Sequence, residues 1–161
     1  MKKVLVAYFS ASGVTENLAK NLAQVVNGDL FEMKPVTAYT AADLDWNDAN
    51  SRSSLEMKDP NSRPAIAQQV SNMAQYDTVF VGFPIWWYVC PRIVQTFLES
   101  YDFSGKTVIG FATSGSSGMG KTDDVLKQCC SGETNWKPGK RLNANSDTKT
   151  IQEWVDSLHL S

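Results

Sequence analysis

Residues 10 to 15 read Ser10-Ala11-Ser12-Gly13-Val14-Thr15, a short turn rich in hydroxyl groups. The turn follows the apolar run Val4–Phe9, and an amphipathic segment leaves it. A helix N-terminus attracts anions, because its unpaired amide donors and its dipole both favour negative charge. We therefore interpret the turn as a phosphate site between a strand and a helix.

Composition and charge place the chain among ordinary globular proteins. With 161 residues, 42% of them hydrophobic, it is expected to form a single domain spanning residues 1–161. A net charge of −2 and the lack of a basic run argue against a nucleic-acid partner. No apolar run approaches the roughly 20 residues that cross a bilayer, and no signal peptide is evident, so we expect no membrane partner and a cytoplasmic location. The three cysteines lack metal-site spacing and are expected to be reduced thiols.

The spacing of apolar residues predicts five strands alternating with five helices. The predicted strands are Val4–Phe9, Asp29–Lys34, Thr78–Phe83, Thr107–Ala112 and Lys140–Leu142, with a turn at Trp136–Gly139 before the last. The predicted helices begin near Val14, Arg63, Pro91, Thr122 and Thr150, the last with an alternative start near Asp147. Such alternation implies an α/β fold in three layers, a doubly wound parallel sheet with helices on both faces.

Residues 36 to 62 interrupt this alternation. The segment is polar and holds no lasting period of 2 or 3.6 residues, and a loop of this length in a compact domain is usually functional or disordered. Its aromatic residues Tyr39 and Trp46 indicate that it packs against the rest of the chain. Two interpretations remain open: a surface excursion anchored by these rings, or a flap that borders the ligand site or contacts a partner.

Three unusual loops each follow the carboxyl end of a predicted strand: Ser10–Thr15, Pro84–Tyr88 and Thr113–Gly120. In a parallel sheet these ends lie along one edge, so the loops can surround one ligand. The first offers hydroxyls and amides to a phosphate, the second offers aromatic rings, and the third has small residues that allow close approach. Together they favour a flat aromatic cofactor with one phosphate, since neither the three-glycine dinucleotide fingerprint nor the P-loop is present.

At these residues the chain resembles the flavodoxins, whose phosphate loop reads T/S-x-T-G-x-T. Ser10–Thr15 follows that pattern with serine at the third position, and Pro84-Ile85-Trp86-Trp87 resembles a P-I-W-W motif of compact bacterial members. The resemblance implies bound FMN and a five-stranded sheet of order 2-1-3-4-5. It implies these FMN-binding residues: Ser10, Ser12, Gly13, Val14 and Thr15 for the phosphate; Pro84, Ile85, Trp86, Trp87 and Tyr88 for the isoalloxazine; and Ser114, Gly115 and Gly118 for its pyrimidine edge.

The function implied by the resemblance is that of a low-potential electron-transfer protein with redox protein partners, a reductase and an acceptor. An FMN-dependent NAD(P)H reductase of quinones or similar small acceptors remains the alternative, because the same fold serves both. A regulatory module that binds a phosphate ligand without redox chemistry is a third interpretation. Residues 84 to 91 contain no glycine, so we expect the one-electron-reduced flavin to be less stabilised than in ordinary flavodoxins. No acid–base catalytic constellation is visible.

Overall fold

Five parallel strands form one sheet in the order β2-β1-β3-β4-β5, which confirms the predicted order. The computed structural model describes residues 3–10, 13–45, 47–86, 90–113, 122–143 and 146–158. The strands are β1 (Val4–Tyr8), β2 (Asp29–Glu32), β3 (Thr78–Pro84), β4 (Thr107–Thr113) and β5 (Asn135–Leu142). The strand order reverses between β1 and β3, which is where ligands bind in open sheets of this kind.

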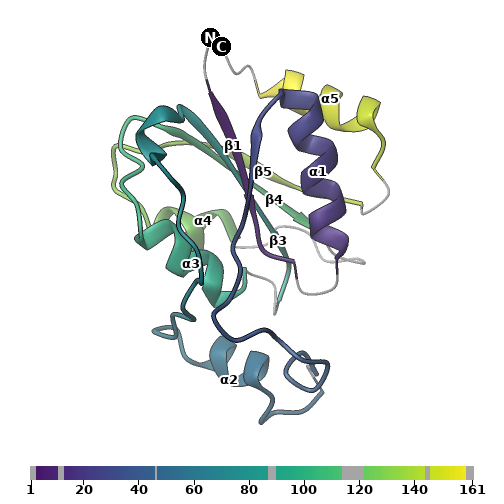
Figure 1. Cartoon of the computed structure of the whole chain (residues 1–161), viewed down its shortest axis with the longest axis vertical. Helices are drawn as coiled ribbons and strands as arrows, with labels where there is room; N and C mark the ends of the chain where they lie inside the picture. Colours follow the sequence, from purple (N-terminus) through teal and green to yellow (C-terminus); the bar gives the residue numbers. More distant parts are fainter. Residues whose placement is uncertain are drawn as a thin grey trace.

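Helices cover both faces of the sheet and complete the three predicted layers (Figure 1). On one face lie α1 (Val14–Val26) and α5 (Thr148–Ser157), and on the other lie α3 (Arg92–Glu99) and α4 (Thr122–Lys127). The short helix α2 (Arg52–Lys58) lies beyond the end of the sheet, close to α3, and a 3₁₀ turn, η1 (Met73–Gln75), precedes β3.

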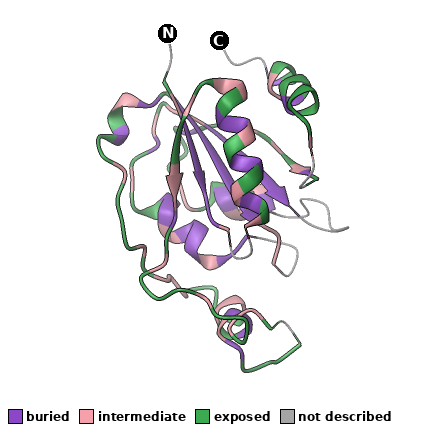
Figure 2. Cartoon of the chain, turned by 45° about the vertical axis from the view of Figure 1, so that its right-hand side comes forward, coloured by how far each residue is buried: buried purple, intermediate pink, exposed green. Residues whose placement is uncertain are grey.

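The core is built by strand residues that point alternately to the two faces. In β3, Val79, Val81 and Phe83 pack on the side of α3, whereas Phe80 packs on the side of α1 and α5. Burial along the central strands is nearly complete, as the purple strands of Figure 2 show. Gly82 is a point of close packing, because a Cβ atom there would overlap the ring of Phe111 on β4.

Local signals at the helix ends behave as the sequence indicates. Asn27 ends α1 in the left-handed region at φ 52°, and the amide of Gly28 donates to the carbonyl of Ala23 at 2.9 Å. The Asp147 carboxylate accepts a hydrogen bond from the Thr150 amide at 2.8 Å and caps α5. The earlier of the two predicted starts of this helix is therefore confirmed.

The helix predicted from Arg63 to Met73 is wrong. Residues 63–72 instead return alongside residues 34–36, with the amide of Val36 donating to the carbonyl of Ala65 at 3.0 Å and that of Ala67 to Lys34 at 2.6 Å. These hydrogen bonds join the two ends of the excursion, and they take the place of the backbone hydrogen bonds that a helix would form. The apolar residue Ile66 still packs against the core, so the spacing identified an inward side without identifying a helix.

The excursion, residues 36–62, contains the helix α2, which the sequence pattern did not predict. Ser51 caps it by accepting a hydrogen bond from the Ser54 amide at 3.3 Å, and its buried residues are Ser53 and Ser54. A seven-residue helix that buries serines has no apolar period to detect.

The turn predicted at Trp136–Gly139 is also wrong, because these residues belong to β5. Ile109 of β4 pairs with Lys137 and Phe111 pairs with Lys140, so β5 carries one extra residue, a bulge, at Pro138 and Gly139. Proline is tolerated here since β5 is an outer strand. β2 ends two residues before the predicted Lys34, ahead of the return segment.

Candidate functional site at the carboxyl edge of the sheet

The described residues of the first and second predicted loops, together with the residue that begins the third, lie at the carboxyl ends of β1, β3 and β4. Pro84 pairs with Thr113 across β3 and β4, and the amide of Ile85 donates to the carbonyl of Thr113 at 3.1 Å. The amide of Phe9 donates to the carbonyl of Gly82 at 2.9 Å and joins the end of β1 to β3. Hydrogen bonds therefore tie the three strand ends together along this edge.

Seven of the thirteen predicted FMN-binding residues lie in the described part of the chain. They are Ser10, Gly13, Val14, Thr15, Pro84, Ile85 and Trp86. The others lie outside the described residues: Ser12, Trp87, Tyr88, Ser114, Gly115 and Gly118.

The turn after β1 presents an open, anion-attracting helix start. Gly13 adopts φ +90°, a left-handed conformation that favours glycine, and a Cβ atom there would have no neighbour within 4 Å. The amide of Gly13 donates to Ser10 Oγ at 3.0 Å and closes the turn on itself. No side chain caps α1, and within the described residues no hydrogen bond is found from the amides of Val14, Thr15 or Glu16. This arrangement of unpaired donors fits a phosphate group.

Thr15 links the first loop to the third. Its side chain is buried at 2% exposure, and its hydroxyl oxygen lies 2.8 Å from that of Thr113, which is 5% exposed. A hydroxyl has one donor and two acceptor sites, so Thr15 can accept from Thr113 and keep its own proton for a ligand. With Thr113 as the donor, the pair leaves the Thr15 proton available to a ligand.

Three rings pack edge to face beside these turns. We call Phe9, Tyr39 and Trp86 the ring cluster. Their ring centroids lie 5.5 Å apart for Phe9 and Tyr39, 5.7 Å for Phe9 and Trp86, and 5.7 Å for Tyr39 and Trp86. Trp86 is half-buried. The cluster brings the excursion, through Tyr39, to the edge of the candidate site.

Polar contacts on α2 hold Tyr39 in place. Its hydroxyl donates to Glu56 Oε1 at 2.5 Å, and the Arg52 guanidinium lies 3.8 Å from the centre of its ring. Arg52 Nε also donates to Glu56 Oε2 at 3.0 Å, so both oxygens of this carboxylate are bonded. Burial, followed by the bond to Glu56, raises the pKa of Tyr39, which therefore remains protonated at neutral pH.

The excursion also carries exposed carboxylates. Asp45 and Asp48 are exposed and accept hydrogen bonds from the amides of Asn47 and Asn50, at 3.0 and 2.9 Å. The chain returns to the sheet through Arg63, which pairs with Glu99 at 2.8 Å on the last turn of α3. Two carboxylates of the excursion, Asp45 and Asp48, face solvent.

Cys90 is fully buried, and burial raises the pKa of its thiol to about 12. This agrees with the expectation of a reduced structural thiol. In the described ranges no group of histidine, cysteine and acidic residues is arranged to hold a metal ion. None of the helices within those ranges is long and apolar enough to cross a membrane.

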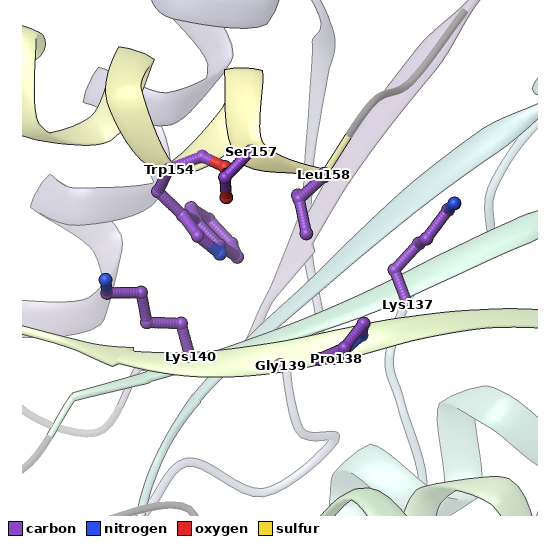
Figure 3. Close-up of a pocket in the computed structure, with 7 residues that line it drawn as sticks. All are labelled: Lys137, Pro138, Gly139, Lys140, Trp154, Ser157 and Leu158. Carbon is purple, nitrogen blue, oxygen red and sulfur yellow. The ribbon is translucent and has the colours of Figure 1, made fainter.

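A cavity of about 380 Å³ lies elsewhere, between β5 and α5 (Figure 3). Lys137 and Lys140 extend from β5 on the two sides of the cavity, and Trp154 and Leu158 lie across from the strand. The β5 bulge places both lysines on the same face of the sheet. None of the residues that line the cavity is a predicted cofactor-binding residue.

Sequence reasoning missed Phe9, Tyr39 and Thr113 as neighbours of the site. Phe9 was assigned to the first strand, and Thr113 was noted only as the first residue of the third loop. For Tyr39 a signal existed, because it is one of two large aromatic residues in an otherwise polar segment. Nothing in the sequence indicated which strand end it would reach.

Comparisons with known proteins agree with this geometry. A family model described as flavodoxin matches residues 3–158. A candidate flavoprotein of Bacteroides eggerthii is 48% identical, with a TM-score of 0.94 and full coverage of both chains. One from Bacteroides uniformis is 49% identical, with a TM-score of 0.91 and coverage of 96% of this chain and 98% of that one.

A more distant structure extends the comparison. A flavoprotein of Lactobacillus acidophilus, solved in complex with FMN, is 21% identical, with a TM-score of 0.72 and coverage of 96% of this chain and 99% of that one. At this identity the likeness concerns the fold. No curated protein matches the chain significantly.

Proposed function

We propose, since this chain belongs to the flavodoxin family, that it binds one FMN at the carboxyl edge of its sheet and acts as a low-potential electron-transfer protein. The cofactor supplies the redox chemistry, because its ring accepts and releases electrons. The protein binds it, orients it and limits the access of water and other reactants.

The first turn fits the phosphate. Uncapped amides at the start of α1 and the hydroxyl of Thr15 supply donors without a cationic side chain. Ser10 and Gly13 keep the turn open, and Gly13 leaves free space where a side chain would stand. Ser12, for which no structural statement is made, remains a predicted part of the same turn.

The observation that carries the proposal is the ring cluster. Phe9, Tyr39 and Trp86 pack edge to face at the carboxyl edge of the sheet, beside the loop after β3. A flavin beside Trp86 would have one side covered by aromatic packing. Hydride transfer from a nicotinamide needs an open ring face, whereas electron transfer needs only an accessible ring edge. The ring cluster would leave at most one face of the flavin to a nicotinamide, which supports electron transfer through the ring edge as the first candidate.

An FMN-dependent NAD(P)H reductase of quinones or similar small acceptors is the second candidate. The charge supports it, since a net charge of −2 gives little long-range attraction to basic redox partners. If the protein is an electron carrier, we propose that the exposed carboxylates of the excursion, Asp45 and Asp48, provide that attraction locally. We also propose that its reductase and acceptor are cytoplasmic proteins.

Two measurements test the proposal. The purified protein, mixed with FMN, should bind one equivalent with a shifted flavin absorption spectrum and quenched flavin fluorescence. It should then show only slow steady-state oxidation of NAD(P)H with a quinone, while a chemically reduced sample passes electrons quickly to a one-electron acceptor. Rapid turnover with NAD(P)H and quinone would favour the reductase, and failure to bind FMN would refute both.

A further inference from the structure

Tyr39 is the point at which the outgoing arm of the excursion folds back onto the sheet. Tyr39 is half-buried, whereas all the remaining side chains between residues 36 and 42 are exposed. Its ring meets Phe9 at an interplanar angle of 66° and Trp86 at 71°, and Trp86 stands at 89° to Phe9. The Trp86 ring is therefore held from two directions, by one residue of the sheet and one of the excursion.

The excursion can hold Trp86 only if Tyr39 is itself fixed. The hydroxyl of Tyr39 is bonded to Glu56, and Arg52 lies against its ring while its Nη1 donates to the carbonyl of Thr37 at 2.7 Å. Arg52 thus joins α2 to the segment of the chain that carries Tyr39. The tyrosine has a fixed ring position and a bonded hydroxyl.

A second connection fastens α2 to the start of α3. Arg92, the first residue of α3, donates from Nε to the carbonyl of Glu56 at 3.2 Å and from Nη2 to the carbonyl of Met57 at 2.9 Å. Carbonyls at the end of a helix carry partial negative charge, which suits a guanidinium. The excursion therefore contacts Trp86 near the start of the loop after β3 and Arg92 directly after that loop.

We propose that Tyr39 is a positioning residue for the cofactor, which sets the orientation of the Trp86 ring toward the flavin. The proposal makes the excursion part of the flavin site and rests on the proposed binding of FMN. Aromatic edge-to-face contacts have preferred geometries and stabilise beyond the area that they bury. Loss of the Tyr39 ring would free Trp86 to change its rotamer, whereas loss of the hydroxyl alone would leave both ring contacts.

The test compares Tyr39→Leu and Tyr39→Phe with Tyr101→Leu as the matched control. Tyr101 lies on the same face of the sheet, contacts the rings of Phe97 and Phe103, and has a bonded hydroxyl, but it follows α3 at the opposite end from the site. Thermal unfolding of the apoprotein, the FMN dissociation constant, the circular dichroism of bound flavin and its midpoint potential are measured for each variant.

Both leucine variants should unfold at lower temperature. Tyr39→Leu alone should raise the FMN dissociation constant about tenfold, the order expected for loss of two ring contacts, and change the flavin circular dichroism and potential. Tyr39→Phe, which keeps the ring, should have the same flavin circular dichroism and midpoint potential as the wild type. In a Trp86→Leu background, Tyr39→Leu should have little further effect on FMN affinity, because the two residues act as one unit.

Several results would overturn the inference. These are unchanged flavin signals in Tyr39→Leu, an equal loss of affinity in Tyr101→Leu, or additive effects of the Tyr39 and Trp86 substitutions. Failure of the wild-type protein to bind FMN would instead refute the proposed function, and the inference with it. In that case the near-ultraviolet circular dichroism of the apoprotein still tests whether Tyr39 orients the Trp86 ring, because the change caused by Tyr39→Leu should be much smaller in the Trp86→Leu background.

Discussion

Removing the Thr15 hydroxyl should affect the protein in two separable ways. The Thr15 and Thr113 oxygens lie 2.8 Å apart with exposures of 2% and 5%, so each valine substitution leaves the other hydroxyl buried and without this partner. The cost of such an orphaned group is about 1–3 kcal/mol. In a chain of this size it corresponds to a fall in Tm of roughly 2–12 °C.

FMN affinity should respond differently. Thr15→Val removes a donor to the phosphate, and a hydrogen bond to a charged group contributes about 1.5–3 kcal/mol. The dissociation constant should therefore rise roughly 10- to 150-fold. Thr113→Val leaves the Thr15 hydroxyl in place and should change the constant by about threefold or less, well under that range.

The double variant separates the two effects. With both hydroxyls replaced by methyl groups of the same shape, no buried polar group is orphaned, so stability should return close to that of the wild type. The FMN dissociation constant should stay as high as in Thr15→Val. Thermal unfolding of the apoprotein and fluorescence titration with FMN measure these quantities.

Two outcomes would refute the reasoning. If Thr15→Val binds FMN like the wild type, the phosphate does not contact this hydroxyl. If the double variant is destabilised by the sum of the single effects, the two hydroxyls do not form a pair in solution.

Three further predictions concern the scaffold. Gly82→Ala should lower the free energy of unfolding by about 1–3 kcal/mol, because the new methyl group would overlap the Phe111 ring. Gly132→Ala is the control, because a Cβ atom there has no neighbour within 4 Å, and it should not lower stability. Urea unfolding of the two variants measures the difference. Glu99 has a pKa lowered from 4.5 by its arginine partner, so the pair stabilises the fold above about pH 4.5 and loses this contribution as the pH falls through the folded-state value. Glu99→Gln should therefore lower Tm slightly at pH 7, and by less as the pH falls through the folded-state pKa. Cys90, with a pKa raised to about 12, should react with a maleimide at pH 7.5 only after denaturation, as thiol counting by mass spectrometry would show.

Much of the sheet could be predicted, because its central strands carry unbroken apolar runs. β1, β3 and β4 are buried on both faces and flanked by helices, which leaves no polar alternation to obscure them. β5 was predicted too short since it is an outer strand with mostly half-buried or exposed residues and an internal Pro-Gly pair. Local rules assign such a pair to a turn, whereas pairing with β4 absorbs it as a bulge.

Sequence reasoning anticipated the geometry of the site where the signal is local and missed contacts that depend on distant pairing, while the assignment of these residues to FMN stays a prediction. The turn at Ser10 and Gly13 follows directly from residue type and helix geometry. The hydroxyl pair joins Thr15 to a residue 98 positions away, and the ring cluster depends on where the excursion returns. Such contacts arise from tertiary packing, which periodicity and propensity do not encode.

The bulge of β5 has a consequence for the behaviour of the protein at high concentration. An outermost strand presents unpaired backbone groups that can recruit a strand of another molecule and begin aggregation. Here Pro138 supplies no amide hydrogen, the extra residue distorts the repeat, and Lys137 and Lys140 bring positive charge to the same short segment. A second chain approaching this side would find an irregular hydrogen-bonding pattern and electrostatic repulsion from its own copy of the lysines. The irregularity that made the predicted β5 too short should thus also hinder intermolecular sheet growth.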